Sequence, residues 1–443
     1  MRKKTIGIVL EFGFHDLKKY IYSGLGKKIS EHFDIIWLTI QKNSKEFHRL
    51  FSETGFPIVY FNATDFIGSS ITESRNISVR RAWMSKYKLG EFHNYRKLNI
   101  SIIRKLILGN KIIKQFYENR TLSIIESRYY NDKVNDVIKE KNITQILGTG
   151  YSSSFSKSVF VTAKKNNLPC HLLVNNWKDL YINDFVPFRF LSSLFLWDEN
   201  MKSSYKYHMP YLKSNTLIVS GNPVFDYLKI SHPKYNRQYY SRKYNINTKA
   251  DWLYYTMMSP LAGINEEEIV KTIAKELAKK FNRVEKVILL RRNPQHKNTD
   301  FNGMEFPDNV IITNHYSYFD LEKDIHTQSP EGEQEWIDLL HHCELNLSVP
   351  STVTLEFLTL NKPVINIGFG PDGKPDERLK QHFEAGFYKP LFKDERVKKV
   401  ERIEELIPAI NSSKRISTGQ IIAEEKRLAS DTIIKRLLEE GSK

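Results

Sequence analysis

The sequence predicts an α/β protein with two Rossmann-like, doubly wound domains that face a central cleft. Its 443 residues are too many for one hydrophobic core and suit two domains of about 200 residues each. Hydrophobic residues make up 40% of the chain, which is enough apolar material for two cores and argues against disorder. Short β-rich runs alternate with longer helical runs in both halves, as is typical of parallel sheets covered by helices.

In the first half, strand candidates alternate with helical runs and together build one doubly wound domain. Helices are expected over residues 16–31, 131–141 and 154–166, between runs rich in Ile, Val, Leu and aromatic residues. We expect this domain to span residues 1–230. The six strand candidates are residues 5–12, 33–40, 56–63, 144–150, 169–176 and 193–200.

The second half repeats the design after a polar, tyrosine-rich stretch at residues 231–249, where we place the domain junction. A second domain is expected over residues 250–418, and an amphipathic helix within residues 419–443 is expected to brace the domains. Two consecutive sheets of this kind leave the space between them as the natural ligand site. The expected strands are residues 252–258, 286–294, 309–315, 343–349 and 362–369, and the expected helices are residues 266–281, 332–342 and 352–360.

Cysteine content and hydropathy bear on the compartment. Cys170 and Cys343 lie far apart, which suits neither a disulfide framework nor a cysteine zinc site, so we expect a reducing cytoplasm. The apolar run after the basic N-terminus is interrupted by Glu11, and residues 185–197 are too short to span a bilayer and include Arg189. We therefore expect a cytoplasmic protein that is either fully in solution or peripheral at the inner face of the membrane.

Positive charge is concentrated in one segment of the first half. The formal net charge is +16, and the segment from Arg75 to Arg120 alone contributes +10. Residues 99–117 have the spacing of a basic amphipathic helix, in which Lys111 and Lys114 lie between apolar residues that include Ile113 and Phe116. In an ordinary helix of this kind the apolar face lies in the core and the basic face in solvent. This helix either has an ordinary solvated basic face or contacts an anionic membrane or an acidic, lipid-phosphate-linked acceptor. No nucleic-acid-binding motif accompanies the charge, so no nucleic-acid partner is expected. The residues predicted to face the membrane or acceptor are Arg81, Lys86, Lys88, Arg104, Lys105, Lys111 and Lys114.

An anion site is predicted where a strand ends at Val349 and a helix begins near Ser351 and Thr352. Backbone N–H groups at a helix start, together with two hydroxyls, suit a phosphate or diphosphate. Glu356 lies one helical turn after Thr352 on the same face, where a carboxylate can accept hydrogen bonds from ribose hydroxyls. The alternative is an ordinary capped helix with a solvated Glu.

This strand, hydroxyl pair and Glu, followed by Asn361-Lys362-Pro363 and a second strand, resemble the donor-binding region of GT-B glycosyltransferases. The resemblance implies that the helix start holds the donor phosphate and Glu356 holds the ribose. Residues 171–228 are similar to the end of the N-terminal domain in nucleotide-sugar transferases and CDP-glycerol glycerophosphotransferases. The resemblance therefore implies the GT-B form of the two-domain fold.

One departure concerns the second strand of the C-terminal half. Polymer-forming transferases of the group usually carry His-Pro there, whereas this chain reads Arg-Arg-Asn-Pro from Arg291. Arg291 and Arg292 could clamp phosphate, because guanidinium groups match phosphate oxygens, or they could be a surface pair. Ser259, after the first strand of that half, is a further donor-binding candidate.

The chain lacks the Asp-x-Asp triplet with which metal-dependent transferases hold a divalent ion, so we expect neither a metal nor another cofactor. The general base of an inverting transferase of this fold normally comes from the N-terminal domain. His15 and Asp16 follow the first strand at its carboxyl end and are the first candidates, with Asp179 in reserve. The alternative is that Asp16 caps a helix and His15 packs beside it.

The resemblance implies a metal-independent glycosyltransferase that moves a sugar from a nucleotide-activated donor to a surface-glycan or lipid-linked acceptor. A nucleotide-sugar 2-epimerase has the same architecture and is the nearest alternative. The alternative from another class is a non-enzymatic, membrane-peripheral or acidic-polymer-binding protein built around the basic segment.

Overall fold

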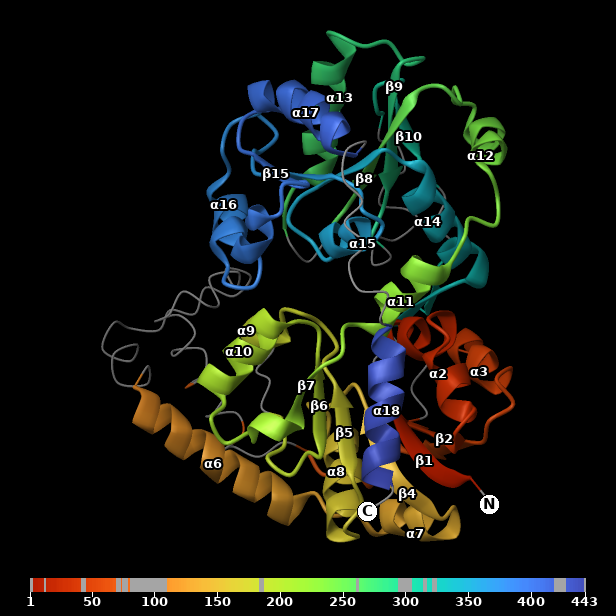
Figure 1. Cartoon of the computed structure of the whole chain (residues 1–443), viewed down its shortest axis with the longest axis vertical. Coiled ribbons are helices and arrows are strands. Elements are labelled where there is room, and N and C mark those ends of the chain that lie inside the picture. The colour runs from red at the N-terminus through yellow and green to blue at the C-terminus, as the bar shows by residue number, and fades with distance from the viewer. Residues whose placement is uncertain are drawn as a thin grey trace.

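A computed structural model describes residues 3–11, 13–40, 45–68, 73, 79, 110–182, 187–259, 263–293, 305–313, 317–320, 325–417 and 428–441. It shows two α/β halves, one above the other in Figure 1. Among the described helices, none is long and apolar enough to cross a membrane.

The first half contains a seven-stranded, all-parallel sheet with the order β3-β2-β1-β4-β5-β6-β7. Six of these strands were predicted, and the seventh, β7, adds an edge strand. The strands are β1 (Lys4–Leu10), β2 (Phe33–Ile40), β3 (Ile58–Phe61), β4 (Ile143–Gly148), β5 (Cys170–Leu173), β6 (Ser193–Leu196) and β7 (Leu217–Val219). The helices are α1 (Phe14–Asp16), η1 (Leu17–Tyr22), α2 (Leu25–Ser30), α3 (Lys45–Ser52), η2 (Ala63–Asp65), α6 (Lys111–Arg128), α7 (Asp132–Glu140), α8 (Ser154–Lys165), α9 (Asp179–Ile182), α10 (Glu199–His208), η4 (Ser214–Thr216) and α11 (Pro223–Ile230).

The second half contains a six-stranded parallel sheet with the order β10-β9-β8-β13-β14-β15 and a separate hairpin of β11 and β12. The hairpin and β15 were not predicted. The strands are β8 (Asp251–Thr256), β9 (Lys286–Arg291), β10 (Val310–Ile312), β11 (Ser317–Asp320), β12 (Ile325–Gln328), β13 (Leu345–Ser348), β14 (Val364–Ile367) and β15 (Val397–Val400). The helices are α12 (Arg237–Tyr244), α13 (Glu266–Ala278), α14 (Pro330–His342), α15 (Val353–Thr359), α16 (Glu377–Glu384), η7 (Lys389–Lys393), η8 (Ile403–Glu405), α17 (Leu406–Ser417) and α18 (Ala429–Gly441).

Both sheets have the doubly wound order that the alternation of strands and helices predicts, with apolar layers on both faces. The two halves are therefore Rossmann-like. One apolar cluster runs continuously through both halves, and a separate cluster covers the opposite face of each sheet. The relative position of the halves thus rests partly on shared apolar packing.

The prediction of a single helix over residues 16–31 is wrong, because this segment forms two separate helices, η1 and α2. A π-helix, η1, ends at Tyr22, and Gly24 then adopts a left-handed conformation with φ of 75° before α2 begins. Glycine accepts this conformation without steric cost, which lets the chain turn between the two pieces. The π-turns carry Lys18, which pairs with Glu333 of the second half, and Lys19, which bonds Asn175 of the first half.

The last helix, α18, returns to the first half and packs against α2 and α11 (Figure 1). Its start is capped by Asp226 of α11, whose carboxylate oxygens accept the N–H groups of Ala429 at 2.8 Å and Ser430 at 2.7 Å. These N–H groups have no partner within the helix, and a negative charge is favourable at this end. Asp226 thereby ties the chain's return to the helix that leaves the first half.

We expect Asp226→Ala to lower the free energy of unfolding by about 1–2 kcal/mol, because it leaves two buried N–H groups without an acceptor. Urea denaturation measures this change, and limited proteolysis should cleave near α18 faster than in the wild type. Asp431→Ala is the matched control, because Asp431 is an exposed carboxylate on the same helix whose pair with Lys28 contributes less than about 1 kcal/mol. Equal losses in both variants would contradict the capping role.

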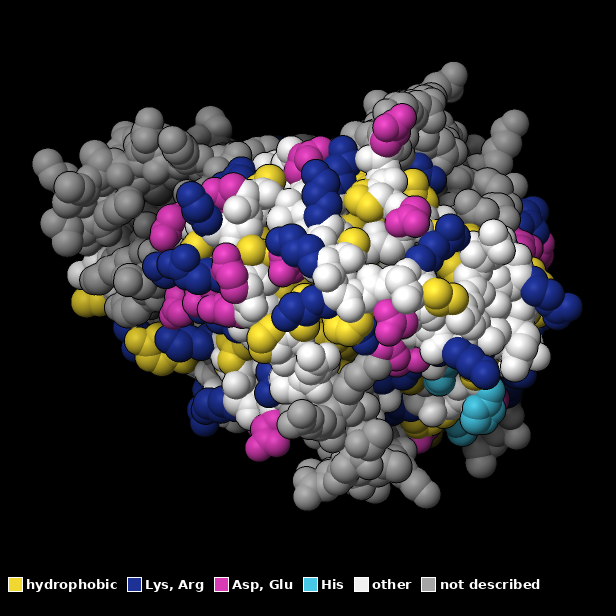
Figure 2. Space-filling view, turned by 90° about the horizontal axis from the view of Figure 1, so that it is seen from above, with side chains coloured by type: hydrophobic (Ala, Val, Ile, Leu, Met, Phe, Trp, Pro, Cys, Tyr) yellow, Lys and Arg dark blue, Asp and Glu magenta, His cyan; other side chains and the backbone are white. Residues whose placement is uncertain are grey.

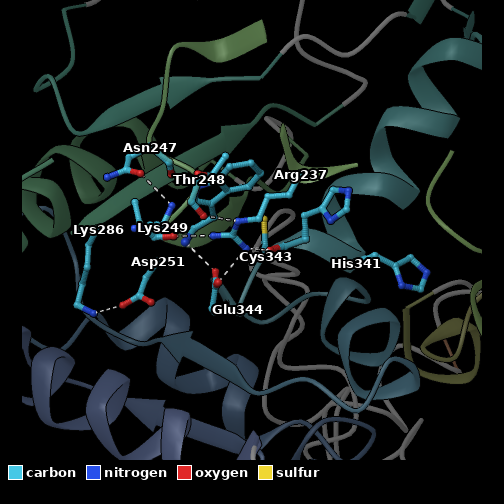
Figure 3. A network of polar contacts seen from close by, with 12 residues as sticks. Arg237, Asn247, Thr248, Lys249, Asp251, Lys286, His341, Cys343 and Glu344 are labelled. Atoms are coloured by element: carbon cyan, nitrogen blue, oxygen red, sulfur yellow. Dashed lines mark hydrogen bonds and ion pairs between the residues drawn. The ribbon is translucent and has the colours of Figure 1, made fainter. Parts of the chain in front are cut away.

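The tyrosine-rich stretch that was predicted to be the junction packs on the second sheet. Arg237 of α12 donates to the carbonyl of Thr248 and to Glu344 Oε1, each at 2.9 Å, and its guanidinium carbon lies 4.1 Å from the Trp252 ring centroid. Glu344 Oε2 in turn accepts the N–H of Trp252 at 2.7 Å. Figure 3 shows this network, which fixes α12 at the end of the second sheet away from the first half.

Candidate functional site

The carboxyl ends of the central strands of both sheets lie at the boundary between the halves. In each sheet the strand order reverses once, between β1 and β4 and between β8 and β13, and such points are where doubly wound sheets bind ligands. In Figure 1, α9 and α11 of the first half face α15 and α16 of the second. We call this region the interdomain edge.

The start of α15, where the anion site was predicted, has no side-chain cap. The helix begins at Val353, and Thr352 occupies the cap position without making a side-chain cap hydrogen bond. The Ser351 hydroxyl is buried and makes no hydrogen bond to any described residue. Neither hydroxyl therefore caps α15. Capping was the alternative interpretation of this segment.

Glu356 joins a buried cluster that the sequence did not reveal. Its Oε2 accepts the indole N–H of Trp336 on α14 at 2.8 Å. The guanidinium carbon of Arg291, at the end of β9, lies 3.9 Å from the Trp336 ring centroid. Arg291 is 8% exposed, so it is not part of a surface arginine pair. The indole holds the carboxylate and the guanidinium at the same edge of the sheet.

The first half contributes Lys18 to the same cluster. Lys18 Nζ lies 3.4 Å from Glu333 Oε1 on α14 and 5.8 Å from the Trp336 ring centroid. Both side chains of this ion pair are largely buried, and burial raises the pKa of Glu333 although Lys18 and Arg291 act in the opposite direction. The ion pair joins the halves directly beside the predicted donor residues.

The remaining predicted donor residues lie at the same edge. Arg292 and Ser259 follow β9 and β8 and are both half-buried. The loop that holds Ser259 is fixed by Glu266, whose carboxylate accepts the N–H of Met258 at 2.7 Å and the hydroxyl of Tyr255 at 3.0 Å. Burial raises the pKa of Glu266 to about 8.

The raised pKa of Glu266 predicts a pH dependence of stability. Between the ordinary pKa of a Glu in the unfolded chain, about 4.3, and the folded value of about 8, the folded protein binds more protons. The stabilisation that Glu266 gives the folded protein is therefore fully present below about pH 4.3, and it is lost as the pH rises to about 8. We expect the free energy of unfolding of Glu266→Gln, minus that of the wild type, to grow by about 1 kcal/mol per pH unit in this window. Urea denaturation from pH 5 to 9 tests this, and a constant difference would contradict it.

On the first half, Asp16 holds two loops together. Its Oδ2 accepts the N–H of Glu11 and its Oδ1 accepts the hydroxyl of Thr149, both at 2.7 Å, and the residue is fully buried. It thereby joins the ends of β1 and β4 and does not cap the helix that follows. His15, the neighbouring candidate base, is exposed on the same turn.

Asp179 is likewise buried and accepts the N–H of Asn176 at 2.9 Å. Between it and Asp16 lies Lys19, whose Nζ donates to Asn175 Oδ1 at 2.5 Å. Burial lowers the pKa of Lys19 to about 8, and the nearby charges of Asp16 and Asp179 oppose that shift. The structure thus brings Asp16 and Asp179 into one charged cluster, although they lie far apart in the sequence.

Glu11, which sequence reasoning did not select, fixes the start of α8. Its Oε1 accepts the N–H of Ser153 at 3.0 Å, and its Oε2 accepts the hydroxyl of Ser156. Burial raises the pKa of this carboxyl. Gly150 is required beside it, because a Cβ there would lie 1.5 Å from Glu11 Oε2.

An aromatic contact places this first-half edge against α15. Trp177, after β5, packs on Phe387 and Tyr388 with ring centroids 5.1 and 5.4 Å apart. The Tyr388 hydroxyl is 2.7 Å from Thr354 Oγ1 on α15. The loop after β5 therefore buttresses the helix that carries Glu356.

The residues predicted for membrane or acceptor contact have a different outcome. Arg81, Lys86, Lys88, Arg104 and Lys105 lie outside the described residues, and Lys111 is exposed at the start of α6. Lys114 is 4% exposed, and its Nζ contacts Glu118 Oε2 at 2.8 Å and the carbonyl of His208 at 2.5 Å. The prediction of a surface contact is wrong for Lys114, because the side chain packs α6 onto α10.

Several residues at the interdomain edge were not predicted, namely Lys18, Lys19, Glu11, Glu333 and Trp336. Trp336 and Lys18 are more than 300 residues apart, and each lies in a segment with ordinary helical spacing. The sequence offered one signal for these residues, because Lys18 lies only two residues after the candidate site residue Asp16.

Comparison with solved structures identifies the fold. No protein-family model and no curated protein sequence matches the chain. The UDP-GlcNAc 2-epimerase of Methanocaldococcus jannaschii is similar over 99% of both chains, with 14% identity and a TM-score of 0.56. The chain has the GT-B fold.

Two bacterial structures extend this similarity. The UDP-GlcNAc 2-epimerase of Neisseria meningitidis, bound to UDP-GlcNAc, matches 98% of this chain and 100% of its own, with 14% identity and a TM-score of 0.53. A putative UDP-N-acetylglucosamine 2-epimerase of Listeria monocytogenes matches 99% and 98%, with 12% identity and a TM-score of 0.54. The structural similarity over nearly the whole chain establishes the GT-B fold, but sequence identity this low does not identify the reaction.

Proposed function

We propose that the chain is a metal-independent enzyme that binds a nucleotide-activated sugar at the interdomain edge and transfers the sugar to a surface-glycan or lipid-linked acceptor. The observation that carries the proposal is the uncapped start of α15 with the Glu356–Trp336–Arg291 cluster beside it. Hydroxyls, a guanidinium and a carboxylate there match the phosphates and ribose of a nucleotide.

The second half is proposed to hold the donor. Ser351, Thr352 and Arg291 would receive its phosphates, with Arg292 and Ser259 on the adjoining strand ends, and Glu356 would receive the ribose hydroxyls. The leaving nucleoside diphosphate gains negative charge during transfer, and a buried guanidinium stabilises such charge more than an exposed one would. This supplies the role of a metal ion from the chain's own groups.

The first half is proposed to receive the acceptor. In an inverting transfer, His15 would take the proton of the acceptor hydroxyl, because it is exposed on the turn that follows β1. Asp16 and Asp179 are buried, so we assign them positioning roles, holding the loops after β1, β4 and β5 in place. Lys18 would orient the two halves through Glu333.

A nucleotide-sugar 2-epimerase remains the second candidate, on a specific observation. The three similar structures described above are 2-epimerases or putative 2-epimerases that cover the whole fold, and the Neisseria structure holds UDP-GlcNAc. A UDP-sugar is therefore the first substrate to test for both reactions.

A thermal-shift screen with UDP, GDP, CDP, CMP and TDP should identify the nucleotide, because a bound ligand raises apparent stability in a concentration-dependent way. The corresponding nucleotide sugar is then incubated without acceptor. A transferase gives slow hydrolysis, whereas an epimerase gives a 2-epimer that proton NMR resolves. Transfer to an added acceptor should persist in EDTA. Loss of transfer that Mg²⁺ or Mn²⁺ restores would contradict the metal-independent mechanism, and no stabilisation by any nucleotide would contradict both reactions.

A further inference from the structure

Three large apolar side chains on α6 and on the end of α10, which packs against α6, are exposed to solvent. Ile112, Phe116 and Tyr207 are 77%, 59% and 54% exposed. Ile112 and Phe116 are four residues apart on α6 and therefore neighbours on one helix face. Lys111 Nζ lies 5.9 Å from the Tyr207 ring centroid, which places the end of α10 beside the first turn of α6. We call Ile112, Phe116 and Tyr207 the α6 patch.

The way α6 packs against α10 explains why Ile112 and Phe116 point into solvent. The helix buries Lys114 and Glu118 as an ion pair, and Lys114 also bonds the carbonyl of His208 at the end of α10. With about 100° between successive helical residues, this orientation turns Ile112 and Phe116 outward. The sequence spacing predicted the reverse, with Phe116 in the core and Lys114 in solvent. The structure places polar groups in the contact with α10 and apolar groups on the surface.

Positive charge surrounds the α6 patch. Lys111, Arg120 and Lys206 are exposed, and none of them forms a salt bridge with another described residue. Arg120 continues the Ile112–Phe116 row by another four residues, and Lys206 precedes Tyr207. By contrast, Figure 2 shows Lys and Arg intermingled with Asp and Glu at the end of the molecule formed by the second half.

We propose that the α6 patch docks on an anionic lipid bilayer. Ile112, Phe116 and Tyr207 enter the boundary between head groups and acyl chains, while Lys111, Arg120 and Lys206 contact anionic head groups. A helix with exposed apolar residues bordered by Lys and Arg is suited to lie in this boundary, and tyrosine is favoured there. Three apolar side chains are few for a protein partner, which needs about 20–30 residues on each side. The proposal does not depend on the reaction at the interdomain edge.

The test is co-sedimentation of the full chain with vesicles of phosphatidylcholine and phosphatidylglycerol, and with vesicles of phosphatidylcholine alone. The wild type should sediment with the anionic vesicles and release them as salt rises. Ile112→Gln/Phe116→Gln should bind the anionic vesicles roughly 10- to 100-fold more weakly, because the apolar surface of these two side chains is no longer available for burial in the bilayer. Gln has a high helix propensity and both positions are exposed, so the variant should have the same melting temperature as the wild type.

Val284→Gln is the matched control, because Val284 is a single exposed aliphatic residue on the second half, 58% exposed. It should bind vesicles as the wild type does. Lys111→Gln/Arg120→Gln/Lys206→Gln gives an independent readout and should flatten the salt dependence. The proposal is overturned if the wild type stays in the supernatant, or if the apolar variant binds as well as the control. A dimer in sedimentation velocity that Ile112→Gln/Phe116→Gln dissolves, without vesicle binding, would instead assign the α6 patch to a second copy of the chain.

Discussion

Lys114→Ala is expected to lower the free energy of unfolding by about 3–5 kcal/mol, because it removes the cation that is paired with the buried Glu118 carboxylate. Glu118 is fully buried, and Lys114 also satisfies the carbonyl of His208 at the end of α10. The substitution therefore removes a charge partner and a link between two helices. Urea denaturation followed by circular dichroism measures the loss.

Two variants separate this role from a general effect of changing α6. Lys111→Ala removes an exposed lysine from the same helix and should change stability by less than about 0.5 kcal/mol. Lys114→Met/Glu118→Leu removes both charges while keeping side-chain volume, and it should recover most of the loss. If Lys114→Ala were no worse than Lys111→Ala, Lys114 would face solvent, as the sequence spacing predicted.

The α6 result shows where helical periodicity fails as a guide to the core. Period and spacing placed Ile113 and Phe116 inward because apolar residues are usually buried. The chain instead buries a Lys–Glu pair four residues apart, and pairing removes much of the penalty for burying each charge. Periodicity cannot detect this, because the partner carbonyl of His208 lies 94 residues away.

The sheets could be predicted because their strands are continuous apolar runs between turn-forming residues. Runs such as residues 33–40 and 286–291 are buried on both faces, which parallel sheets require. β15 was missed because its sequence, Val-Lys-Lys-Val, is short and half polar, as suits the edge of a sheet. β7, which was also missed, is likewise an edge strand, so the central strands of both sheets are as predicted.

The candidate site could be predicted only within single segments. Thr352 is the cap residue of α15 and Glu356 lies in the first turn of this helix, so their spacing in the sequence predicts that they lie on one face. Trp336 and Arg291 come from other elements, and the contacts of Trp336 with Glu356 and with Arg291 depend on how α14 lies across the sheet. The assignment of nucleotide binding to this cluster stays a prediction.

That prediction has the largest expected effect on binding. Glu356→Gln should weaken binding of the nucleotide chosen by the thermal-shift screen by roughly 10- to 150-fold, because a hydrogen bond to a charged acceptor contributes about 1.5–3 kcal/mol. Oε2 of Glu356 accepts the Trp336 indole, while Oε1 accepts no hydrogen bond from the described residues and can receive a ribose hydroxyl. Titration calorimetry gives the affinity. Glu331→Gln is the control, because Glu331 is an exposed carboxylate on α14.

Trp336→Phe distinguishes ribose binding by Glu356 from support of the fold. It removes the indole N–H that holds Glu356 but keeps an aromatic ring near Arg291, so it should weaken nucleotide binding less than Glu356→Gln does. In the double variant the two effects should not add, because Trp336 acts on the nucleotide through Glu356. Unchanged affinity in Glu356→Gln, with an unchanged melting temperature, would move the nucleotide away from α15. Additive losses would instead mean that Trp336 contacts the nucleotide itself.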